Sequence, residues 1–408
     1  MNRNWLPLKC LTAGLFVTLV QVVSAVWFIG PEGSFSYRYS TLIQHDGYWF
    51  ANIVERGYGT TVPPSSHKMM EVSNVAFFPA YPVIAGVLHD ALHLSTTNAL
   101  LLTAQLAAWG FWTYFFLFCA RWKLRGSLQW FGALAILAHP AAFFLVTGYS
   151  ESLFLMMLAG FLYWSAGEGR AAKVLAALHG FTMSATRIVG IPCAAFPVVH
   201  SIFKAQGSRP RSFRSRLRQY GPAVAIMLFS LLGAISFFAY CQLRWGRWDI
   251  YMLTQEAGWA ISPDYLAVFK PSSYRWLIPP LNDPQEASQL TMTLAAVLFA
   301  IILIGELVPA FRRGTSWNTR VGIYFCAAII YYVSVAGVAS VEMESMLRYD
   351  FCVHALIVLA LLHYLNEFRL QPRLVRIFGI GVATAVMIGG FAIQGFYIWN
   401  FMRGNWVA

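Results

Sequence analysis

The chain has 408 residues, of which 58% are hydrophobic and only 11% are charged, and its mean hydropathy is +0.57. Soluble domains carry about 25% charged residues, so this composition excludes a soluble enzyme, a disordered chain and a disulfide scaffold. Apolar runs of about 20 residues recur from end to end, which predicts an all-α polytopic membrane protein. The net charge of +12 then indicates basic cytoplasmic loops, and no nucleic acid partner is expected.

Hydropathy and charge predict about eleven membrane spans with the N-terminus inside. The first apolar run, 11–30, is longer than the roughly 7–15 apolar residues of a signal peptide, so we expect a retained helix. The stretch 174–203 is interrupted by Arg187 and two prolines, and we expect two short helices that meet near Arg187 on the outer side. The other spans are expected at about 98–119, 128–146, 150–166, 220–242, 290–310, 321–339, 350–366 and 377–398.

Basic residues define the inner side of this topology. The strongest signal is a basic cytoplasmic loop at 204–218, and Arg312, Arg313 and Arg320 are assigned to another inner loop. The acidic residues then fall mostly on the outer side. We expect one domain, 1–408, whose outer side carries a long first loop, 31–97, and a second loop, 243–289.

Segment 77–93 of the first outer loop could be read as a further span. A span there would move the basic residues at 121–125 to the outer side, against the positive-inside rule. We therefore expect a helix that lies in the outer membrane interface with its apolar face down.

Asp46 is the first candidate for chemistry. It follows the first span after a short polar stretch and stands beside Tyr48 and Trp49. A carboxylate at the membrane surface can act as a general base on a hydroxyl group that it reaches at hydrogen-bond distance. The alternative is an interfacial acid within a belt of aromatic residues.

Arg187 and Arg348 are the second candidates. An arginine inside an apolar stretch costs about 2.5–3.5 kcal/mol or more unless it faces a cavity or a partner. Two outer-face arginines could clamp a phosphate, because the guanidinium fork matches phosphate oxygens. The alternatives are structural pairs, which are Arg187 with Glu151 and Arg348 with Glu342, Glu344 or Asp350.

Other chemistries lack motifs in this chain. The sequence has no GxSxG, HExxH, Walker A or Rossmann glycine pattern, and its six cysteines form no CxxC pair. His89 and His93 have the i, i+4 spacing of metal ligands but lack an evident third ligand. No cofactor and no metal site is therefore expected, although the residues do not exclude a divalent metal.

Several motifs resemble, in order along the whole chain, those of the PIG-V-like mannosyltransferases, the family of the second mannosyltransferase of GPI-anchor assembly and its bacterial relatives. The most specific is Asn74 to Pro82, NVAFFPAYP, which is close to the Ala-Phe-Phe-Pro-Leu-Tyr-Pro block of that family. The sequence departs from the family where His45 replaces the tryptophan before Asp46 and where Ile188-Val189 replaces Ser-Asn. The other matching segments are His45-Asp46-Gly47-Tyr48-Trp49, Glu55-Arg56-Gly57-Tyr58, His139-Pro140-Ala141-Ala142-Phe143-Phe144, Tyr149-Ser150-Glu151-Ser152-Leu153-Phe154, Ala185-Thr186-Arg187-Ile188-Val189-Gly190 and Leu347-Arg348-Tyr349.

The resemblance implies a GT-C-type transmembrane fold with interfacial helices in the first outer loop. It implies an inverting glycosyltransferase that moves a sugar, usually mannose, from a polyprenyl-phosphate sugar to a lipid-linked or cell-envelope acceptor. The reaction would take place on the extracytoplasmic face of a bacterial inner membrane. Asp46 would deprotonate the acceptor, and Arg187 and Arg348 would hold the donor phosphate. Substrate-binding residues are expected at His45, Tyr48, Trp49, Glu55, Asn74, Phe78, Tyr81, Tyr149 and Glu151.

Two other classes of function remain as alternatives. A polyprenyl-lipid or solute transporter would share the many spans and the intramembrane charges, but transporters often show internal repeats and broken helices at the midplane. No repeat is evident here. A membrane acyltransferase would require a histidine within a span, and His179, His200 and His354 lack supporting partners in the sequence.

Overall fold

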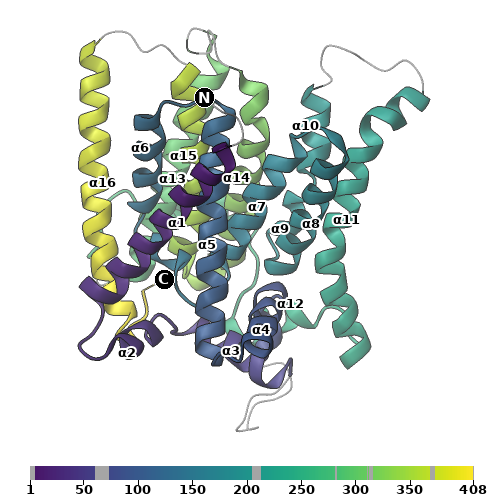
Figure 1. Ribbon diagram of the computed structural model, residues 1–408, viewed down its shortest axis with the longest axis vertical. Helices are drawn as coiled ribbons and strands as arrows, with labels where there is room; N and C mark the ends of the chain where they lie inside the picture. The colour runs from purple at the N-terminus through teal and green to yellow at the C-terminus, as the bar shows by residue number, and fades with distance from the viewer. Residues whose placement is uncertain are drawn as a thin grey trace.

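The computed structural model describes residues 5–59, 73–204, 213–280, 283–309, 311, 316–367 and 373–407, which form helices and no strand (Figure 1). The longer helices are α1 (Leu6–Val23, continued by a π-helical segment Ser24–Ile29), α5 (Thr96–Arg121), α8 (Gly169–Thr186), α11 (Phe213–Trp245), α13 (Pro284–Leu307), α14 (Trp317–Val338), α15 (Met346–Glu367) and α16 (Arg373–Phe401). The shorter helices are α2 (Phe35–Ser40), α3 (Asp46–Arg56), α4 (Ala80–Leu92), α6 (Gly126–Leu137), α7 (Glu151–Ser165), α9 (Gly190–Cys193), α10 (Phe196–Lys204) and α12 (Ile250–Trp259).

Seven helices within the described part of the chain are long and apolar enough to cross a membrane. They confirm the polytopic all-α prediction. The fifteen residues of α7 extend only about 22 Å, which is less than the roughly 30 Å of a hydrocarbon core. The expected total of eleven spans therefore stays a prediction.

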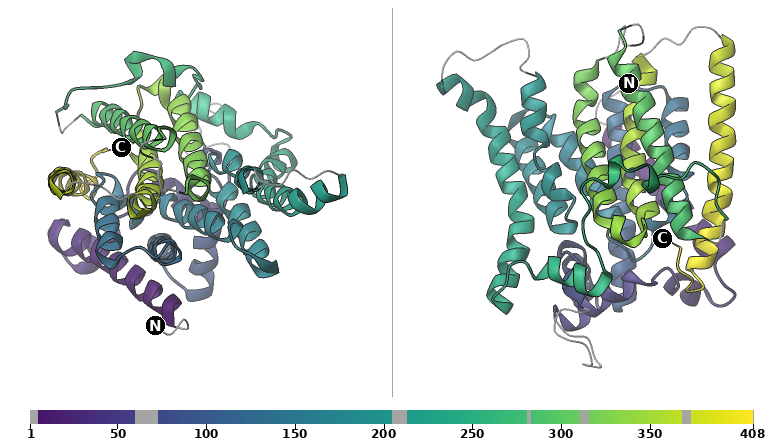
Figure 2. Two further views of the ribbon diagram at one scale, coloured as in Figure 1. Left: turned by 90° about the horizontal axis from the view of Figure 1, so that it is seen from above. Right: turned by 180° about the vertical axis from the view of Figure 1, so that it is seen from behind.

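The helices differ strongly in their surroundings. α15 is central, with 83% of its most apolar window buried, whereas none of the corresponding window of α16 is buried. Figure 2 shows α16 and α11 at opposite edges of the molecule, with the other long helices between them. The faces that α16 and α11 turn outward are rich in apolar side chains, as lipid-facing helices require.

The two ends of the molecule are unlike. The short helices α2, α3, α4 and α12 gather at one end, which is the lower end in Figure 1 and is called here the α3–α4 end. The start of α1, the connection from α5 to α6, the end of α10 and the start of α11 lie at the opposite end. The described residues of two segments that the sequence assigns to the inner side, the connection from α5 to α6 and the helix ends that flank the expected basic loop, therefore share one end of the molecule.

The expected helix 128–146 is wrong in its second half. α6 ends at Leu137, and a turn leads into a short 3-10 helix at Ala142–Leu145. Pro140 lacks the N–H that would continue the helix, so carbonyl groups are left without helical partners. Gln394 of α16 compensates, because its Nε2 donates to the carbonyls of Leu137 at 2.8 Å and His139 at 2.7 Å.

The expected interruption at Arg187 is confirmed. α8 ends at Thr186, Arg187 is extended, and α9 begins at Gly190. A Cβ atom at Gly190 would lie 2.6 Å from the carbonyl oxygen of Met183, so the chain can fold back onto α8 only with glycine there. This break places the Arg187 side chain beside a cavity and away from a regular helix surface.

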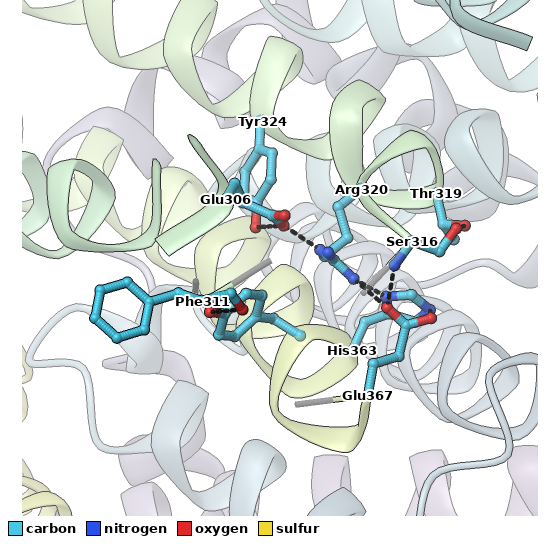
Figure 3. A network of polar contacts seen from close by, with 9 residues as sticks. Glu306, Phe311, Ser316, Thr319, Arg320, Tyr324, His363 and Glu367 are labelled. Carbon is cyan, nitrogen blue, oxygen red and sulfur yellow. Dashed lines mark hydrogen bonds and ion pairs between the residues drawn. The ribbon is translucent and has the colours of Figure 1, made fainter. Parts of the chain in front are cut away.

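Arg320 was expected in an inner basic loop, and this expectation is wrong. Its side chain is fully buried in α14, where it forms ion pairs with Glu306 of α13 and, at 2.9 Å, with Glu367 of α15 (Figure 3). Nδ1 of His363 lies 2.5 Å from the same guanidinium group. The network therefore joins three helices at one level. Because Arg320 is buried among them, it does not indicate which side of the membrane the preceding loop lies on. Arg312, Arg313 and residues 205–212 of the expected basic loop lie outside the described residues.

Candidate functional site

Asp46 is the first residue of α3 and follows a tight turn. The N–H of Gly47 donates to the carbonyl of Gln44 at 2.8 Å, which closes the turn around His45 and Asp46. The Asp46 carboxylate thus stands at the N-terminus of a helix, where the helix dipole favours negative charge. Its side chain is 19% exposed.

Arg348 is the closest charged partner of Asp46, although 302 residues separate them in the sequence. It lies in the first turn of α15, and its Nη1 donates to Oδ2 of Asp46 at 2.5 Å. Its Nε lies 3.2 Å from Oε1 of Glu151, the first residue of α7. The Arg348 side chain is only 6% exposed, so this pairing takes place away from bulk water.

Glu151 also pairs with Arg187. Nη1 of Arg187 donates to the same Oε1 atom that faces Arg348, and the Glu151 side chain is 1% exposed. The four side chains of Asp46, Arg348, Glu151 and Arg187 form a row of alternating charges, called here the charge cluster. Two carboxylates face two guanidinium groups, so its formal charge is zero.

The charge cluster decides between the structural pairs considered for the arginines. The pairing of Arg187 with Glu151 is confirmed. The pairing of Arg348 with Glu342, Glu344 or Asp350 is wrong, because Arg348 turns toward Asp46 and Glu151. Asp350 is buried on the same helix, and its carboxylate has no hydrogen-bond partner within the described residues.

Aromatic rings surround the two guanidinium groups. The Tyr349 ring centre lies 4.8 Å from Cζ of Arg187 and 5.3 Å from Cζ of Arg348. The ring of Tyr149 lies 5.0 Å from Cζ of Arg348. Cation–π contacts of this kind stabilise desolvated arginines. Burial raises the pKa of Tyr149 well above its ordinary value, so its phenol stays protonated.

All four members of the charge cluster line one cavity of about 520 Å³. Its remaining wall is largely apolar and includes Phe77 and Phe78 before α4 and Val333 of α14. Polar side chains come from α12 and the segment after it, among them Gln255, Glu256 and Ser262. The cavity therefore combines a charged end with an extended apolar wall.

Of the predicted substrate-binding residues, Phe78, Tyr149 and Glu151 line this cavity together with Asp46, Arg187 and Arg348. Tyr48, Trp49 and Glu55 do not line it. The Tyr48 side chain is 58% exposed, Trp49 stacks on Phe77 at 6.1 Å, and Glu55 is exposed at the surface of α3.

Asn74 and Tyr81 occupy structural positions behind the cavity wall. Nδ2 of Asn74 donates to Asn52 Oδ1 at 2.7 Å and to the carbonyl of Gly57 at 3.0 Å, and its Oδ1 accepts from the N–H of Gly59. Tyr81 is fully buried and donates to the carbonyl of Leu100 at 2.8 Å. Both residues hold the segment that leads into α4.

His45 also lies outside the cavity lining. Its Nε2 is 3.2 Å from the carbonyl oxygen of Asn405, and its ring meets the ring of Trp406 edge-on at 5.0 Å. A residue expected to touch substrate is therefore packed against the segment that follows α16.

Several cavity residues were not anticipated from the sequence. Tyr349 follows Arg348 directly, and its place in the same motif was an available signal. The Trp and Tyr residues of loop 243–289 are candidates as a group for stacking on a sugar or a polyprenyl chain, and this group includes Tyr251 of α12, but no spacing singles out Tyr251 or Gln255.

The arrangement suggests what the cavity can bind. Two arginines side by side favour an anion with several oxygens, such as a phosphate group. The adjacent carboxylate of Asp46 can accept a proton from a hydroxyl group held at hydrogen-bond distance. Among the described residues, no three His, Cys, Asp or Glu side chains lie close enough together to hold a metal ion.

The sequence matches no family model and no curated protein. In structure, the chain is similar to ArnT from Cupriavidus metallidurans bound to undecaprenyl phosphate, with a TM-score of 0.51 and 14% identity. The match covers 92% of this chain and 63% of ArnT, so the chain spans less than two thirds of the length of that protein. A mycobacterial arabinofuranosyltransferase, AftD, aligns with a TM-score of 0.49 and 16% identity over the whole of this chain and 27% of AftD. The chain therefore has a membrane fold of the GT-C type, similar to that of ArnT.

Proposed function

We propose that this protein is an inverting membrane glycosyltransferase that transfers a sugar, most simply mannose, from a polyprenyl-phosphate sugar to a lipid-linked or cell-envelope acceptor. The observation that carries the proposal is the convergence of Asp46, Arg187 and Arg348 on one cavity. These residues come from α3, from the break after α8 and from α15. A carboxylate and two arginines are the groups that a displacement at a sugar phosphate requires.

Asp46 acts as the general base in this mechanism. Its carboxylate accepts the proton of the acceptor hydroxyl while the acceptor oxygen attacks the anomeric carbon. The bond between that carbon and the phosphate oxygen breaks on the opposite face, and its electron pair leaves with the polyprenyl phosphate. One displacement inverts the configuration of the anomeric carbon.

The two arginines stabilise the leaving group. The donor phosphodiester carries one negative charge, and the departing polyprenyl phosphate gains a second. Arg187 and Arg348 are in place before the reaction and meet this growing charge without reorganisation. A lipid phosphate is a stable anion, so the mechanism requires no strong general acid.

The pair between Asp46 and Arg348 must open for this reaction. Nη1 of Arg348 lies 2.5 Å from Oδ2 of Asp46 and donates a hydrogen bond to it. The same oxygen would have to accept the proton of the acceptor hydroxyl. An incoming donor phosphate competes with the carboxylate for the same guanidinium group. Binding of the donor to Arg348 therefore frees Asp46 for the acceptor.

The rest of the cavity supports a lipid-linked donor. Its apolar wall suits isoprene units that follow the phosphate, and the structurally similar ArnT was solved with undecaprenyl phosphate bound. The ordered resemblance to PIG-V-like motifs favours mannose. The connection from α5 to α6 and the helix ends that flank the basic loop 204–218 are predicted to be cytoplasmic, and they lie at the end of the molecule opposite α3 and α4. This arrangement supports a reaction on the extracytoplasmic face of a bacterial inner membrane.

Sugar transfer by the reconstituted protein tests the proposal. The purified chain in lipid nanodiscs receives labelled polyprenyl-phosphate-mannose and a lipid extract, with Asp46→Asn as the matched variant. We expect label in a new lipid product with the wild type and none with the variant. Donor binding without transfer, from mannose, glucose or arabinose donors, would favour a lipid carrier or transporter. Wild-type turnover by Asp46→Asn would exclude Asp46 as the base.

A further inference from the structure

His45 has a backbone conformation that is unusual for histidine. Its φ of 47° and ψ of −111° match the first central position of a type II′ turn, and the bond from the N–H of Gly47 to the carbonyl of Gln44 closes that turn. Glycine normally takes this position, because a Cβ atom disfavours positive φ. A side chain persists there only when its surroundings hold the backbone in place.

The segment after α16 supplies that support. The His45 ring meets Trp406 edge-on at 5.0 Å and Phe401 at 6.0 Å, and its Nε2 lies 3.2 Å from the carbonyl oxygen of Asn405. The segment is itself anchored to the end of α16. The N–H of Asn405 donates to the carbonyl of Asn400 at 3.1 Å, and its Nδ2 donates to Oδ1 of Asn400 at 3.0 Å.

Asp46 follows His45 directly in this turn, so the backbone of the turn sets the direction in which the Asp46 side chain points. In the structure, Asp46 is also held by Arg348. That second support is lost when the donor phosphate engages Arg348, since the phosphate takes the position of the carboxylate. From then on, the direction of the Asp46 carboxylate depends on the turn at His45 and on what holds the turn.

We propose that His45 and Trp406 are positioning residues, and that their ring contact fixes the turn that aims Asp46 at the acceptor hydroxyl during catalysis. This inference rests on the proposed role of Asp46 as base. It replaces the expected contact of His45 with substrate by an action through the backbone. Neither ring lines the cavity, so neither is expected to contribute to donor affinity.

Four variants test the contact by kinetics. Trp406→Ala and His45→Ala should each lower kcat between about tenfold and a hundredfold, the range for an ångström-scale misplacement of a catalytic group. The KM for the donor should stay within about twofold, and the double variant should lose no more than the worse single variant, because both remove one contact. Trp406→Phe keeps an aromatic ring and should restore most of kcat.

The matched control is Trp399→Ala. Trp399 lies on α16, is 45% exposed and packs on Arg403, so its removal should leave kcat unchanged. A raised donor KM with unchanged kcat in His45→Ala would overturn the inference in favour of direct substrate binding. Full kcat in Trp406→Ala, or losses that multiply in the double variant, would also overturn it.

Hydrogen exchange separates a failure of this inference from a failure of the proposed function, because it requires no turnover. Trp406→Ala should speed amide exchange at Gly47 and Tyr48 at least about tenfold in the folded protein, whereas Trp399→Ala should not. Unchanged exchange would overturn the inference even in an active enzyme. Faster exchange in a chain that transfers no sugar would show that the contact between His45 and Trp406 does hold the turn. It would overturn only the claim that this contact serves catalysis.

Discussion

Replacing Asp46 with asparagine should tighten the binding of a lipid phosphate while it abolishes sugar transfer. The substitution keeps the shape of the side chain but removes one negative charge, so the formal charge of the cluster changes from zero to +1. In the wild type, a phosphate must displace the Asp46 carboxylate from Arg348. In the variant, only a neutral amide stands in its place.

The size of this effect follows from the burial of the pair. Exposed ion pairs contribute about 0–1 kcal/mol, and loss of one partner from a fully buried pair costs about 3–5 kcal/mol. Asp46 is 19% exposed and Arg348 is 6% exposed, which places their pair between these limits. A value of about 1–3 kcal/mol corresponds to binding that is roughly five to 150 times tighter.

Titration of undecaprenyl phosphate against the protein in nanodiscs, followed by native mass spectrometry, measures this affinity. Asp249→Asn is the matched control, because Asp249 pairs with Arg247 at 2.9 Å and does not line the cavity. It should bind the lipid as the wild type does. Equal or weaker binding by Asp46→Asn would refute the idea that phosphate and carboxylate compete for Arg348.

Substitutions at three further positions separate binding from stability. Arg348→Lys keeps a positive charge but loses the planar fork that reaches both carboxylates of the charge cluster. It should raise the donor KM about tenfold in a transfer assay, and an unchanged KM would contradict a phosphate contact. Asn74→Ala removes a side chain that makes three hydrogen bonds and is only 3% exposed. It should lower the free energy of unfolding by about 1–3 kcal/mol, measured by thermal unfolding, and leave lipid affinity unchanged; weaker lipid binding in the folded variant would instead favour the substrate contact expected from the sequence. Arg320→Ala leaves the buried Glu306 and the partly exposed Glu367 without their cation and should cost about 3–5 kcal/mol. Arg320→Lys should recover part of that loss, and equal melting temperatures for wild type and alanine variant would show that the network does not stabilise the bundle.

Local chemistry made part of the fold predictable. The helix break near Arg187 follows from an arginine and two prolines in an apolar stretch, and the structure has it there. The helix expected within 77–93 is α4, which begins directly after Pro79 and holds Pro82 in its first turn, whereas its place in the membrane interface stays a prediction. These features depend on a few adjacent residues, which the sequence displays directly.

Features that depend on distant partners were not predictable in the same way. The pairing of Arg348 with Asp46 bridges 302 positions, so the nearer acids at 342, 344 and 350 were the reasonable candidates. Pro140 ends α6 locally, but the capping of the carbonyls that it leaves unpaired depends on the distant Gln394 of α16. The burial of Arg320 likewise depends on acids from two other helices.

The candidate site was predictable to the same extent. Asp46, Arg187 and Arg348 were selected from the sequence by their chemical type and their predicted location on the outer side. The structure brings all three to one cavity. The aromatic residues of loop 243–289 were candidates only as a group, because nothing in that loop indicates which side chains of α12 face the cavity. His45 was assigned to the substrate because it belongs to a segment that resembles a family motif, whereas its ring packs against Trp406.

The anomeric configuration of the transferred sugar tests the central mechanism most directly. Wild-type protein in nanodiscs would be given polyprenyl-phosphate-mannose of one defined configuration, and the product would be digested with α- and β-specific mannosidases. The proposed mechanism predicts a product of the opposite configuration, formed at a rate that falls to background in Asp46→Asn. A product of retained configuration, or an inverted product formed equally fast by Asp46→Asn, would contradict a single displacement with Asp46 as the base.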